Sequence, residues 1–305
     1  MNKVIVILGP NASGKTGLAV KLAKKFKGEI ISADSRQVYQ GMDIGTGKEG
    51  KRGVINKHPV RFINSIPQYL VDIKKPSQQY TVADFQKQVT GLIQEIIQRN
   101  KIPFIIGGTG LYLDALTKGF IIPQTSKKGQ QIRKKLEKQN LKILLKKLKK
   151  LDFETYQKID KSNKRRIVRA LEVCLITGKK FSELKKESKP DFQFLKIGLT
   201  HPRKKLYELI DKRVDKRIKQ GMIAEVKKLK RQDLSWKRLD DFGLEYRFIA
   251  KYLKGEFKKE EMIEKLKFAI HHFARRQLTW FRRDKEIYWI SSKKQAERSI
   301  KKFMK

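Results

Sequence analysis

Residues 9 to 16 read GPNASGKT and match the pattern G-x-x-x-x-G-K-[ST], which is typical of loops that bind phosphate. Glycines let backbone N–H groups close around phosphate oxygens, and the N-terminus of a following helix adds its dipole. Lys15 would reach a terminal phosphate, and the Thr16 hydroxyl suits Mg²⁺. The candidate phosphate-binding residues are Gly9, Pro10, Asn11, Ala12, Ser13, Gly14, Lys15 and Thr16. The motif indicates a polyphosphate, but it does not distinguish ATP hydrolysis, phosphoryl transfer by a kinase and displacement of a diphosphate leaving group.

The residues around this loop predict alternating strands and helices. A β-branched run precedes the loop, and Leu18, Leu22 and Phe26 follow it at helical spacing. The expected strands are 4–8, 29–34, 102–108 and 194–200, and an amphipathic helix is expected at 82–99. This order predicts an α/β fold like that of P-loop NTPases. In such a fold a parallel sheet is flanked by helices on both faces, and ligands bind at the carboxyl ends of its strands.

The segment from 121 to 190 differs from the rest in composition. Residues 127–150 contain eleven Lys or Arg and one Glu, and their leucines and isoleucines recur at helical spacing. Pro190 and its polar neighbours in KESKPDF resemble a linker back to the sheet. We therefore expect a basic, all-helical domain at 121–190, inserted into a core formed by 1–120 and 191–305.

The overall charge also limits the possible functions. The chain has 73 Lys and Arg against 31 Asp and Glu, a formal net charge of +42, which suggests an anionic partner such as a nucleic acid. Lysine-biased genomic composition would explain part of this excess. The single cysteine, Cys174, excludes an intramolecular disulfide framework and a cysteine-cluster metal site. No signal-peptide pattern and no apolar run of membrane-spanning length is present, so we expect a cytoplasmic protein without a membrane partner. We also expect a monomer.

Five further motifs, together with the phosphate loop, resemble those of the tRNA dimethylallyltransferase family. They are SADSRQVYQGMDIGTGK (32–48), DFQ (84–86), GGTGLYLDAL (107–116), RRIVRALEV (165–173) and RRQLTWFRR (275–283). The resemblance covers nearly the whole chain. It implies transfer of a dimethylallyl group from dimethylallyl diphosphate to the exocyclic N6 of the adenosine 3′ of the anticodon in tRNA, with release of diphosphate. The chain stops at Lys305 without a C-terminal zinc finger, as expected for a bacterial-type member.

This reaction needs a group that removes a proton from a weakly nucleophilic amine. Asp34 lies at the end of an expected strand and is the candidate base. The resemblance implies the same role for the aspartate of the DS motif. An N-cap or an outer ligand of Mg²⁺ is the alternative for Asp34.

Charge that develops on the leaving diphosphate needs cations. Lys15, Thr16 with Mg²⁺, and an arginine from 206–226 would supply them, and that segment resembles the one from which the family takes such an arginine. We expect Arg217 to be the catalytic arginine, with Arg213 as the alternative. Either could instead pair on the surface with Asp211 or Asp215.

Adenosine must leave the anticodon-loop stack before it can react, and base flipping into a pocket would achieve this. The residues expected to hold tRNA are Asp34, Ser35, Arg36, Gln37, Thr109, Arg165, Arg166 and Arg169. Tyr112 could also hold the nucleotide or could simply pack in the core. In RRQLTWFRR, the aromatic residues could be buried anchors with the arginines pointing outward.

Two family motifs are altered here. Gln68 and Tyr69 stand where many members have a histidine pair, and the motif G-Y-[KR] appears as GLEYR at 243–247. A P-loop kinase acting on a small metabolite or nucleoside remains the runner-up interpretation, and a non-catalytic RNA-binding protein is the third. Neither His271 nor His272 has a second ligand at metal-binding spacing, so we expect no metal other than Mg²⁺.

Overall fold

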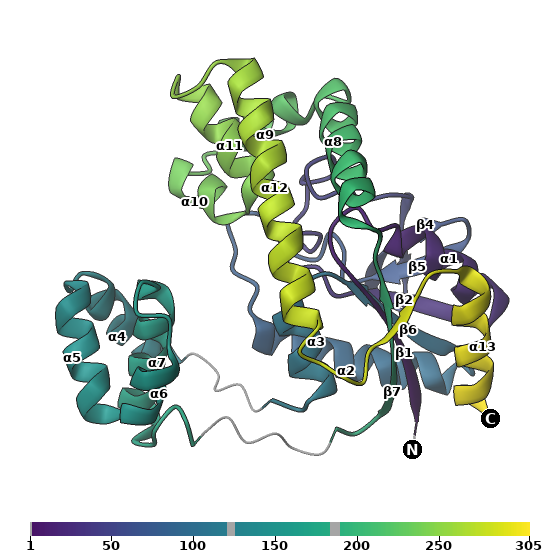
Figure 1. Ribbon diagram of the computed structural model, residues 1–305, viewed down its shortest axis with the longest axis horizontal. Coiled ribbons are helices and arrows are strands. Elements are labelled where there is room, and N and C mark those ends of the chain that lie inside the picture. The colour runs from purple at the N-terminus through teal and green to yellow at the C-terminus, as the bar shows by residue number, and fades with distance from the viewer. Residues whose placement is uncertain (1, 121–125, 184–189) are drawn as a thin grey trace. The chain divides into compact units, whose positions relative to one another are not determined.

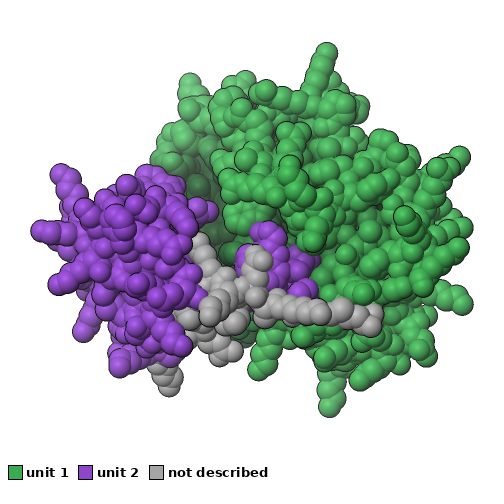
Figure 2. Space-filling view, turned by 60° about the horizontal axis from the view of Figure 1, so that its bottom comes forward, with its two compact units in different colours: residues 1–113, 191–305 green, residues 114–190 purple. Residues whose placement is uncertain are grey.

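The computed structural model describes residues 2–120, 126–183 and 190–305, and the chain divides into two compact units. The first unit comprises residues 1–113 and 191–305, and the second comprises residues 114–190 (Figures 1 and 2). Most of KESKPDF, the expected linker, lies outside the described residues. None of the described helices combines the length and the apolar character that crossing a membrane requires.

An eight-stranded sheet forms the first unit, in the order β3-β4-β5-β2-β6-β1-β7-β8. Its strands are β1 (Lys3–Leu8), β2 (Gly28–Ser32), β3 (Lys51–Ile55), β4 (His58–Ile63), β5 (Ile66–Tyr69), β6 (Ile102–Gly107), β7 (Gln193–Leu199) and β8 (Tyr288–Ile290). Every pair from β5 to β8 is parallel, as predicted, and the four expected strands are present.

The sheet is mixed, because the expected parallel arrangement gives way to antiparallel strands at one edge. β3, β4 and β5 are joined by two antiparallel hairpins. Each hairpin turns on two residues with positive φ, Asn56-Lys57 and Asn64-Ser65. Turns of this kind match the right-handed twist of the flanking strands, which explains how such short connections close the hairpins.

Helices cover both faces of the sheet. α1 (Lys15–Lys25) and α13 (Lys293–Met304) pack on the face that includes Ile5 and Ile7, and α2 (Val82–Gln98) packs against β2 and β6. All residues from Val4 to Ile7 are fully buried, so both faces of β1 are shielded from solvent. Burial of each such side chain contributes about 1.5–3 kcal/mol, which makes the central strands a rigid support for the loops at their ends.

The remaining helices of the first unit follow β7. They are α8 (Arg203–Lys219), α9 (Met222–Arg231), α10 (Trp236–Asp241), α11 (Leu244–Leu253) and α12 (Lys259–Phe281). The long α12 lies beside α8 and α11 (Figure 1). A short helix, α3 (Gly110–Thr117), follows β6, and the second unit begins within it.

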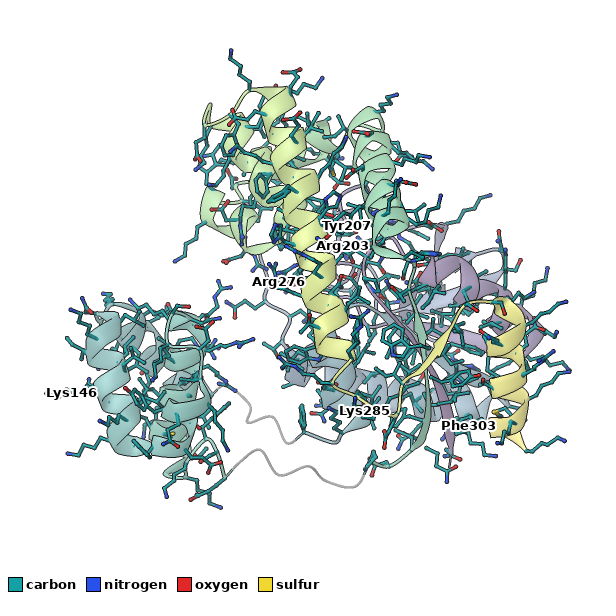
Figure 3. The ribbon with its side chains drawn as sticks, viewed as in Figure 1. Lys146, Arg203, Tyr207, Arg276, Lys285 and Phe303 are labelled. Carbon is teal, nitrogen blue, oxygen red and sulfur yellow. The ribbon has the colours of Figure 1, made fainter. Side chains whose placement is uncertain are left out.

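The second unit is helical. Its other helices are α4 (Lys127–Glu137), α5 (Leu141–Leu151), α6 (Phe153–Lys158) and α7 (Lys164–Thr177). The basic segment is two helices, because the Asn140 side chain caps the N-terminus of α5 by accepting from Lys142 N. Leu144, Leu148 and Leu171 are fully buried in the core of this unit. Lys146 of α5 is one of the many cationic side chains of this unit (Figure 3).

Candidate active site

Three loops meet at one edge of the sheet. They follow β1, β2 and β6 and contain residues 9–14, 33–37 and 108–109. Because these strands are parallel neighbours in the order β2-β6-β1, their carboxyl ends place the three loops side by side. The phosphate motif and Asp34 are therefore brought together, as the sequence predicts for the edge of an α/β sheet.

The phosphate loop has the backbone conformation that its glycines permit. Gly9 and Gly14 have φ of 151° and 86°, and α1 begins directly after Gly14. A side chain at Gly9 would place its Cβ 2.1 Å from the carbonyl oxygen of Leu199, so only glycine fits there. The loop therefore presents backbone N–H groups at a helix N-terminus, which is an arrangement that binds anions.

Lys15 is the cation of this loop. Its Nζ donates a hydrogen bond to the carbonyl oxygen of Pro10 at 2.6 Å. Burial and the nearby charge of Arg213 together lower the pKa of Lys15 to about 7, although Asp34 opposes the shift. A nearby anion stabilises the charged form of a poorly solvated lysine more than that of an exposed lysine.

Asp34 is half-buried at the end of β2. Its Oδ1 accepts hydrogen bonds from the backbone N–H groups of Arg36 at 2.8 Å and Gln37 at 3.3 Å. Among the described residues, nothing donates to its Oδ2. The residues after it form a turn and not a helix, so Asp34 is not a helix N-cap. One oxygen thus fixes the carboxylate while the other is open to a substrate.

The loop at 33–37 is held in place by hydrogen bonds to the sheet and to the loop that follows β6. Ser35 N donates to Thr109 Oγ1 at 3.3 Å. The Gln37 amide oxygen accepts from Ser32 Oγ and from Gln68 Nε2, and its Nε2 donates to the carbonyl of Thr46. The oxygen of this amide accepts two hydrogen bonds and its NH₂ group donates one, so we expect Gln37 to position the loop.

The two altered family positions have clear packing roles. Gln68 supports Gln37, and Tyr69 is buried and donates to Glu29 Oε2 at 2.8 Å.

Tyr112 is only 5% exposed and stacks on Phe85 with ring centroids 4.5 Å apart. Of the two interpretations for Tyr112, the structure supports core packing.

The two candidate arginines of α8 differ in their partners. Arg217 is buried, donates to the carbonyl oxygen of Gly45 at 3.0 Å and pairs with Glu245 at 3.3 Å. Arg213 lies one helical turn earlier, and its Nε is buried without a hydrogen-bond partner among the described residues. Burial and the charge of Arg217 together lower the pKa of Arg213 to about 10, although Glu245 and Asp34 oppose the shift. Arg213 is therefore the arginine with an unused donor and an electrostatic interaction with Asp34.

Neither arginine is paired with the aspartates of α8. Asp211 instead pairs with His271 Nε2 at 2.7 Å, and Asp215 pairs with Lys267 at 2.7 Å. Tyr207 stacks on the His271 ring at a centroid distance of 4.0 Å, and Arg203 lies over Tyr207 (Figure 3). These contacts join α8 to α12, so the aspartates fix the helix that carries Arg213.

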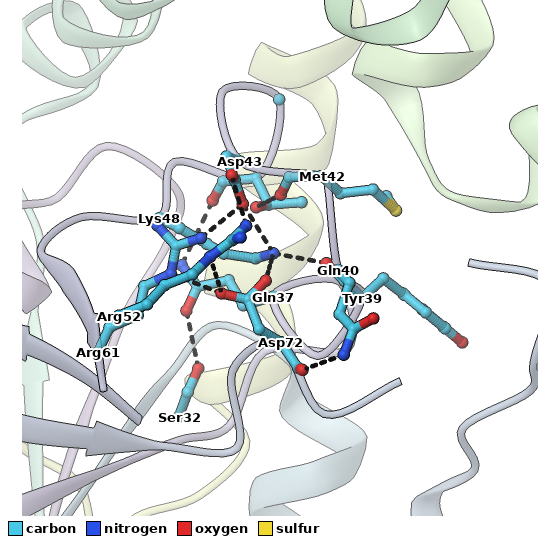
Figure 4. Close-up of polar contacts among 12 residues, drawn as sticks. Ser32, Gln37, Tyr39, Gln40, Met42, Asp43, Lys48, Arg52, Arg61 and Asp72 are labelled. Atoms are coloured by element: carbon cyan, nitrogen blue, oxygen red, sulfur yellow. Dashed lines mark hydrogen bonds and ion pairs between the residues drawn. The ribbon is translucent and has the colours of Figure 1, made fainter. Parts of the chain in front are cut away.

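A cluster of charges anchors the loop between Tyr39 and Lys48 (Figure 4). The Lys48 side chain is completely buried, and its Nζ donates to Asp72 Oδ1 at 2.6 Å, to Asp43 Oδ1 at 3.1 Å and to the carbonyl of Tyr39. Arg61 of β4 binds both aspartates, at 2.7 and 2.6 Å. Lys48 and Arg61 hold the pKa of Asp43 below its usual range. The unexpected hairpin edge of the sheet thus secures a loop that resembles a family motif.

Glu225 of α9 holds the same loop from the other side. Its two oxygens accept from three consecutive backbone N–H groups, those of Asp43 (2.7 Å), Ile44 (2.7 Å) and Gly45 (3.0 Å). Tyr246 of the altered GLEYR motif donates to the same carboxylate at 2.8 Å. The sequence gives no signal for this contact, because Glu225 is about 180 residues from the loop.

The motif RRQLTWFRR contains a buried aromatic residue and exposed arginines, the two kinds of residue expected from the sequence. Phe281 is 3% exposed, as expected for an anchor, and the four arginines of the motif are exposed. Trp280 lies against Gly110, where an added Cβ would come within 2.5 Å of the indole. Gln277 is also buried and contacts two of the active-site loops, which the sequence does not reveal.

In the helical unit, the three predicted tRNA-binding arginines have different surroundings. Arg165 and Arg166 are exposed. Arg169 pairs with Glu172 at 2.8 Å, and the same fully buried carboxylate binds Arg133 at 2.6 Å. We therefore assign Arg169 a structural role in neutralising Glu172, while Arg165 and Arg166 remain candidates for phosphate contact.

Mg²⁺ is the metal that the sequence suggests, and the donor set agrees with it. Thr16 follows Lys15 at the start of α1, and its hydroxyl has no hydrogen-bond partner among the described residues. No group of three potential His, Cys, Asp or Glu ligands occurs in the described chain. A single hydroxyl beside a phosphate loop suits Mg²⁺, which usually takes most of its remaining ligands from phosphate and water.

Comparisons with known proteins agree with the motif resemblance. A family model described as IPP transferase matches residues 37–284, and one described as isopentenyl transferase matches residues 2–59. The tRNA dimethylallyltransferase of Halothermothrix orenii is 44% identical over 296 residues, which cover 94% of this chain and 87% of that protein. That of Carboxydothermus hydrogenoformans is 43% identical over 308 residues, with coverages of 98% and 94%.

Solved structures show the same fold. The tRNA isopentenylpyrophosphate transferase of Bacillus halodurans aligns with a TM-score of 0.70 and 34% identity, covering 100% of this chain and 96% of that one. A eukaryotic dimethylallyltransferase, described as acting on tRNA, aligns with a TM-score of 0.77 and 28% identity, with coverages of 95% and 74%.

The sheet and its phosphate loop define an α/β protein of the P-loop class, with a carboxylate at a neighbouring strand end. The family match extends over most of the chain. The chain belongs to the IPP transferase family.

Proposed function

We propose that this protein transfers a dimethylallyl group from dimethylallyl diphosphate to the exocyclic N6 of the adenosine 3′ of the anticodon in tRNA, and releases diphosphate. The observation that carries the proposal is that the phosphate loop with Lys15 and the loop with Asp34 follow parallel strands whose carboxyl ends share one edge of the sheet. Arg213 of α8 interacts electrostatically with both residues. This combination provides a base for an amine and a binding site for a departing anion. Three relatives with 40–44% identity to this chain are named tRNA dimethylallyltransferases, which supports the proposal.

The leaving diphosphate binds the phosphate loop, Lys15 and Arg213. Negative charge grows on its oxygens as the allylic C–O bond breaks, so these cations stabilise the transition state more than the bound substrate. Thr16 would hold Mg²⁺, which neutralises part of the diphosphate charge when it is bound.

Asp34 takes the proton that the amine loses. As N6 forms a bond to the allylic carbon, Asp34 Oδ2 accepts a hydrogen from N6, and the electron pair of the broken C–O bond leaves with diphosphate. The backbone N–H groups of Arg36 and Gln37 keep Oδ1 occupied and so orient the acceptor. Ser35, Arg36 and Thr109 lie in the loops beside the base and would border the extruded adenosine.

The helical unit binds the phosphates of the anticodon stem through Arg165, Arg166 and the lysines of α4 and α5. Contacts of this kind add affinity without reading sequence. The protein acts as a monomer in the cytoplasm, where its tRNA substrate is found.

Incubation with unmodified tRNA and dimethylallyl diphosphate tests the proposal. Mass analysis of the digested nucleosides should show an adenosine that has gained one dimethylallyl group, and diphosphate should accumulate in equal amount. ATP consumption without isoprenoid transfer would instead support the kinase interpretation. Tight tRNA binding without any turnover would support the RNA-binding interpretation.

Binding of the diphosphate substrate should take up a proton. With a pKa of about 7, Lys15 is charged below pH 7, and about nine-tenths of it is neutral at pH 8. An anionic ligand favours the charged form, so affinity should be nearly constant below pH 7 and fall by up to about tenfold per pH unit above it. Calorimetry at pH 8 in buffers of different ionisation enthalpy measures the uptake.

Lys15→Arg is the matched control for this measurement, because arginine stays charged throughout this range. The difference in proton uptake between the native protein and this variant isolates Lys15 from protonation of the ligand itself. Equal uptake by both proteins would show that Lys15 is already charged before binding.

Charge reversal at Arg165 and Arg166 should weaken tRNA binding and reduce its salt dependence. Two phosphate contacts correspond to a change of about 1.4–1.8 in the slope of log K against log salt. Filter binding between low and physiological salt measures this slope. Arg169→Gln should instead lower the thermal stability of the helical unit, because Glu172 loses one of its two cations. A slope unchanged by the double reversal would remove this surface from the tRNA interface.

A further inference from the structure

Gln277 of α12 connects two loops of the active site. Its Oε1 accepts from the backbone N–H of Asn11 at 2.9 Å, and its Nε2 donates to the carbonyl oxygen of Gly108 at 2.8 Å. The side chain is 6% exposed, so water competes poorly for these bonds. Asn11 belongs to the phosphate loop after β1, and Gly108 belongs to the loop after β6.

The amide orientation is fixed by the two backbone partners. A backbone N–H can only donate and a carbonyl can only accept, so the oxygen of Gln277 must face Asn11 and its NH₂ group must face Gly108. Gly108 approaches this amide closely, because an added Cβ there would lie 2.6 Å from Nε2. The site thus requires one donor and one acceptor at a set separation, which a primary amide provides.

The connection continues to the catalytic carboxylate. Thr109 follows Gly108 directly, and its Oγ1 accepts from the N–H of Ser35, the residue after Asp34. An unbroken series of contacts therefore runs from the phosphate loop through Gln277 and Thr109 to the loop that holds Asp34. Because β6 lies between β1 and β2 in the sheet, the loop after β6 is a neighbour of both other loops.

We infer that Gln277 is a positioning residue that sets the distance between the bound diphosphate and Asp34. This inference rests on the proposed function. The amine must attack the allylic carbon while diphosphate leaves, so the separation of the two loops determines whether the reacting atoms align. Misplacement of reacting groups by about 1 Å can lower a rate by about 10²-fold.

Gln277→Leu and Gln277→Glu separate positioning from simple packing. Leucine fills much of the volume but removes both hydrogen bonds, and we expect the single-turnover rate at saturating substrates to fall by about tenfold or more. The dissociation constant for tRNA should change by less than about twofold, since Gln277 faces protein groups. In Gln277→Glu, an ionised carboxylate would oppose the Gly108 carbonyl oxygen, and the rate should fall similarly at high pH.

Protonation should rescue the glutamate variant. A protonated carboxyl group can donate to Gly108 and accept from Asn11, as the amide does, and burial raises the pKa of such a group. The ratio of its rate to the native rate should therefore rise by about tenfold between pH 8 and pH 6, while the leucine ratio stays constant. Gln220→Glu, at the exposed C-cap position that follows α8, is the control for the added charge and should match the native rate.

The outcomes distinguish this inference from the function on which it rests. If the native protein fails to transfer dimethylallyl groups to tRNA, the proposed function falls. If it is active and Gln277→Leu keeps a rate within about twofold of native, or if the two variants show the same pH-independent ratio, Gln277 does not position the loops. Should Gln277→Leu not fold, as judged by its thermal unfolding, the pH dependence of Gln277→Glu decides alone.

Discussion

Asp34→Asn should lower turnover by about 10²–10⁴-fold, which is the usual contribution of a general base. Asparagine can still accept from Arg36 and Gln37 through its Oδ1, so the loop should keep its conformation. What it loses is the second oxygen with a negative charge, which is the group expected to receive the amine proton. Single-turnover measurement with saturating dimethylallyl diphosphate and tRNA reports this step directly.

Affinity for tRNA should change by less than about twofold in the same variant. Unchanged binding together with low turnover would place the defect in the chemical step. Asp34→Ala is the companion variant, and it should be at least as slow because it also removes the turn contacts. An asparagine variant that retains native turnover would exclude Asp34 as the base.

Replacing Arg213 with alanine should lower kcat/KM for dimethylallyl diphosphate by about 10²–10³-fold, comparable to removal of one donor to a developing anion. Its Nε has no protein partner among the described residues, so the native fold loses little when it is removed. Thermal unfolding should stay close to that of the native protein.

Arg217→Ala is the matched comparison on the same helix. It leaves Glu245 and the carbonyl of Gly45 without their cation, and a broken buried pair costs about 3–5 kcal/mol of stability. We expect a lower unfolding temperature, with the remaining folded enzyme retaining more activity than the Arg213 variant. The reverse pattern, with a stable but inactive Arg217 variant and an active Arg213 variant, would restore the assignment made from the sequence.

The central part of the fold could be predicted because its signals are local. The phosphate loop, the four inner strands and α2 each depend on residues that are near one another in sequence. The hairpin edge was missed because its turns use Asn56-Lys57 and Asn64-Ser65, which lack the glycine that usually marks such turns. The basic segment appeared as one apolar stripe because its leucines and isoleucines keep helical spacing across Asn140. In the structure, Asn140 caps a second helix at this point.

The supports of the active site could not be predicted, since they join distant parts of the chain. Gln277 is 266 residues from Asn11, and Lys48 is 24 residues from Asp72. No periodicity or motif reports which buried amide will meet which backbone group. The sequence could not decide between Arg213 and Arg217 for the same reason. Both are arginines on one helix, and only their contacts with distant residues distinguish them.

The attachment of Glu225 and Tyr246 to residues 43–45 has a consequence for biosynthesis. Translation proceeds from the N-terminus, so the loop emerges from the ribosome about 180 residues before the carboxylate that satisfies its three N–H groups. β7, which pairs with the central strand β1, also emerges only after the helical unit. Nascent chains released before α9 and α11 should therefore expose this loop to proteases and chaperones, and competence for catalysis should arise only when synthesis is nearly complete.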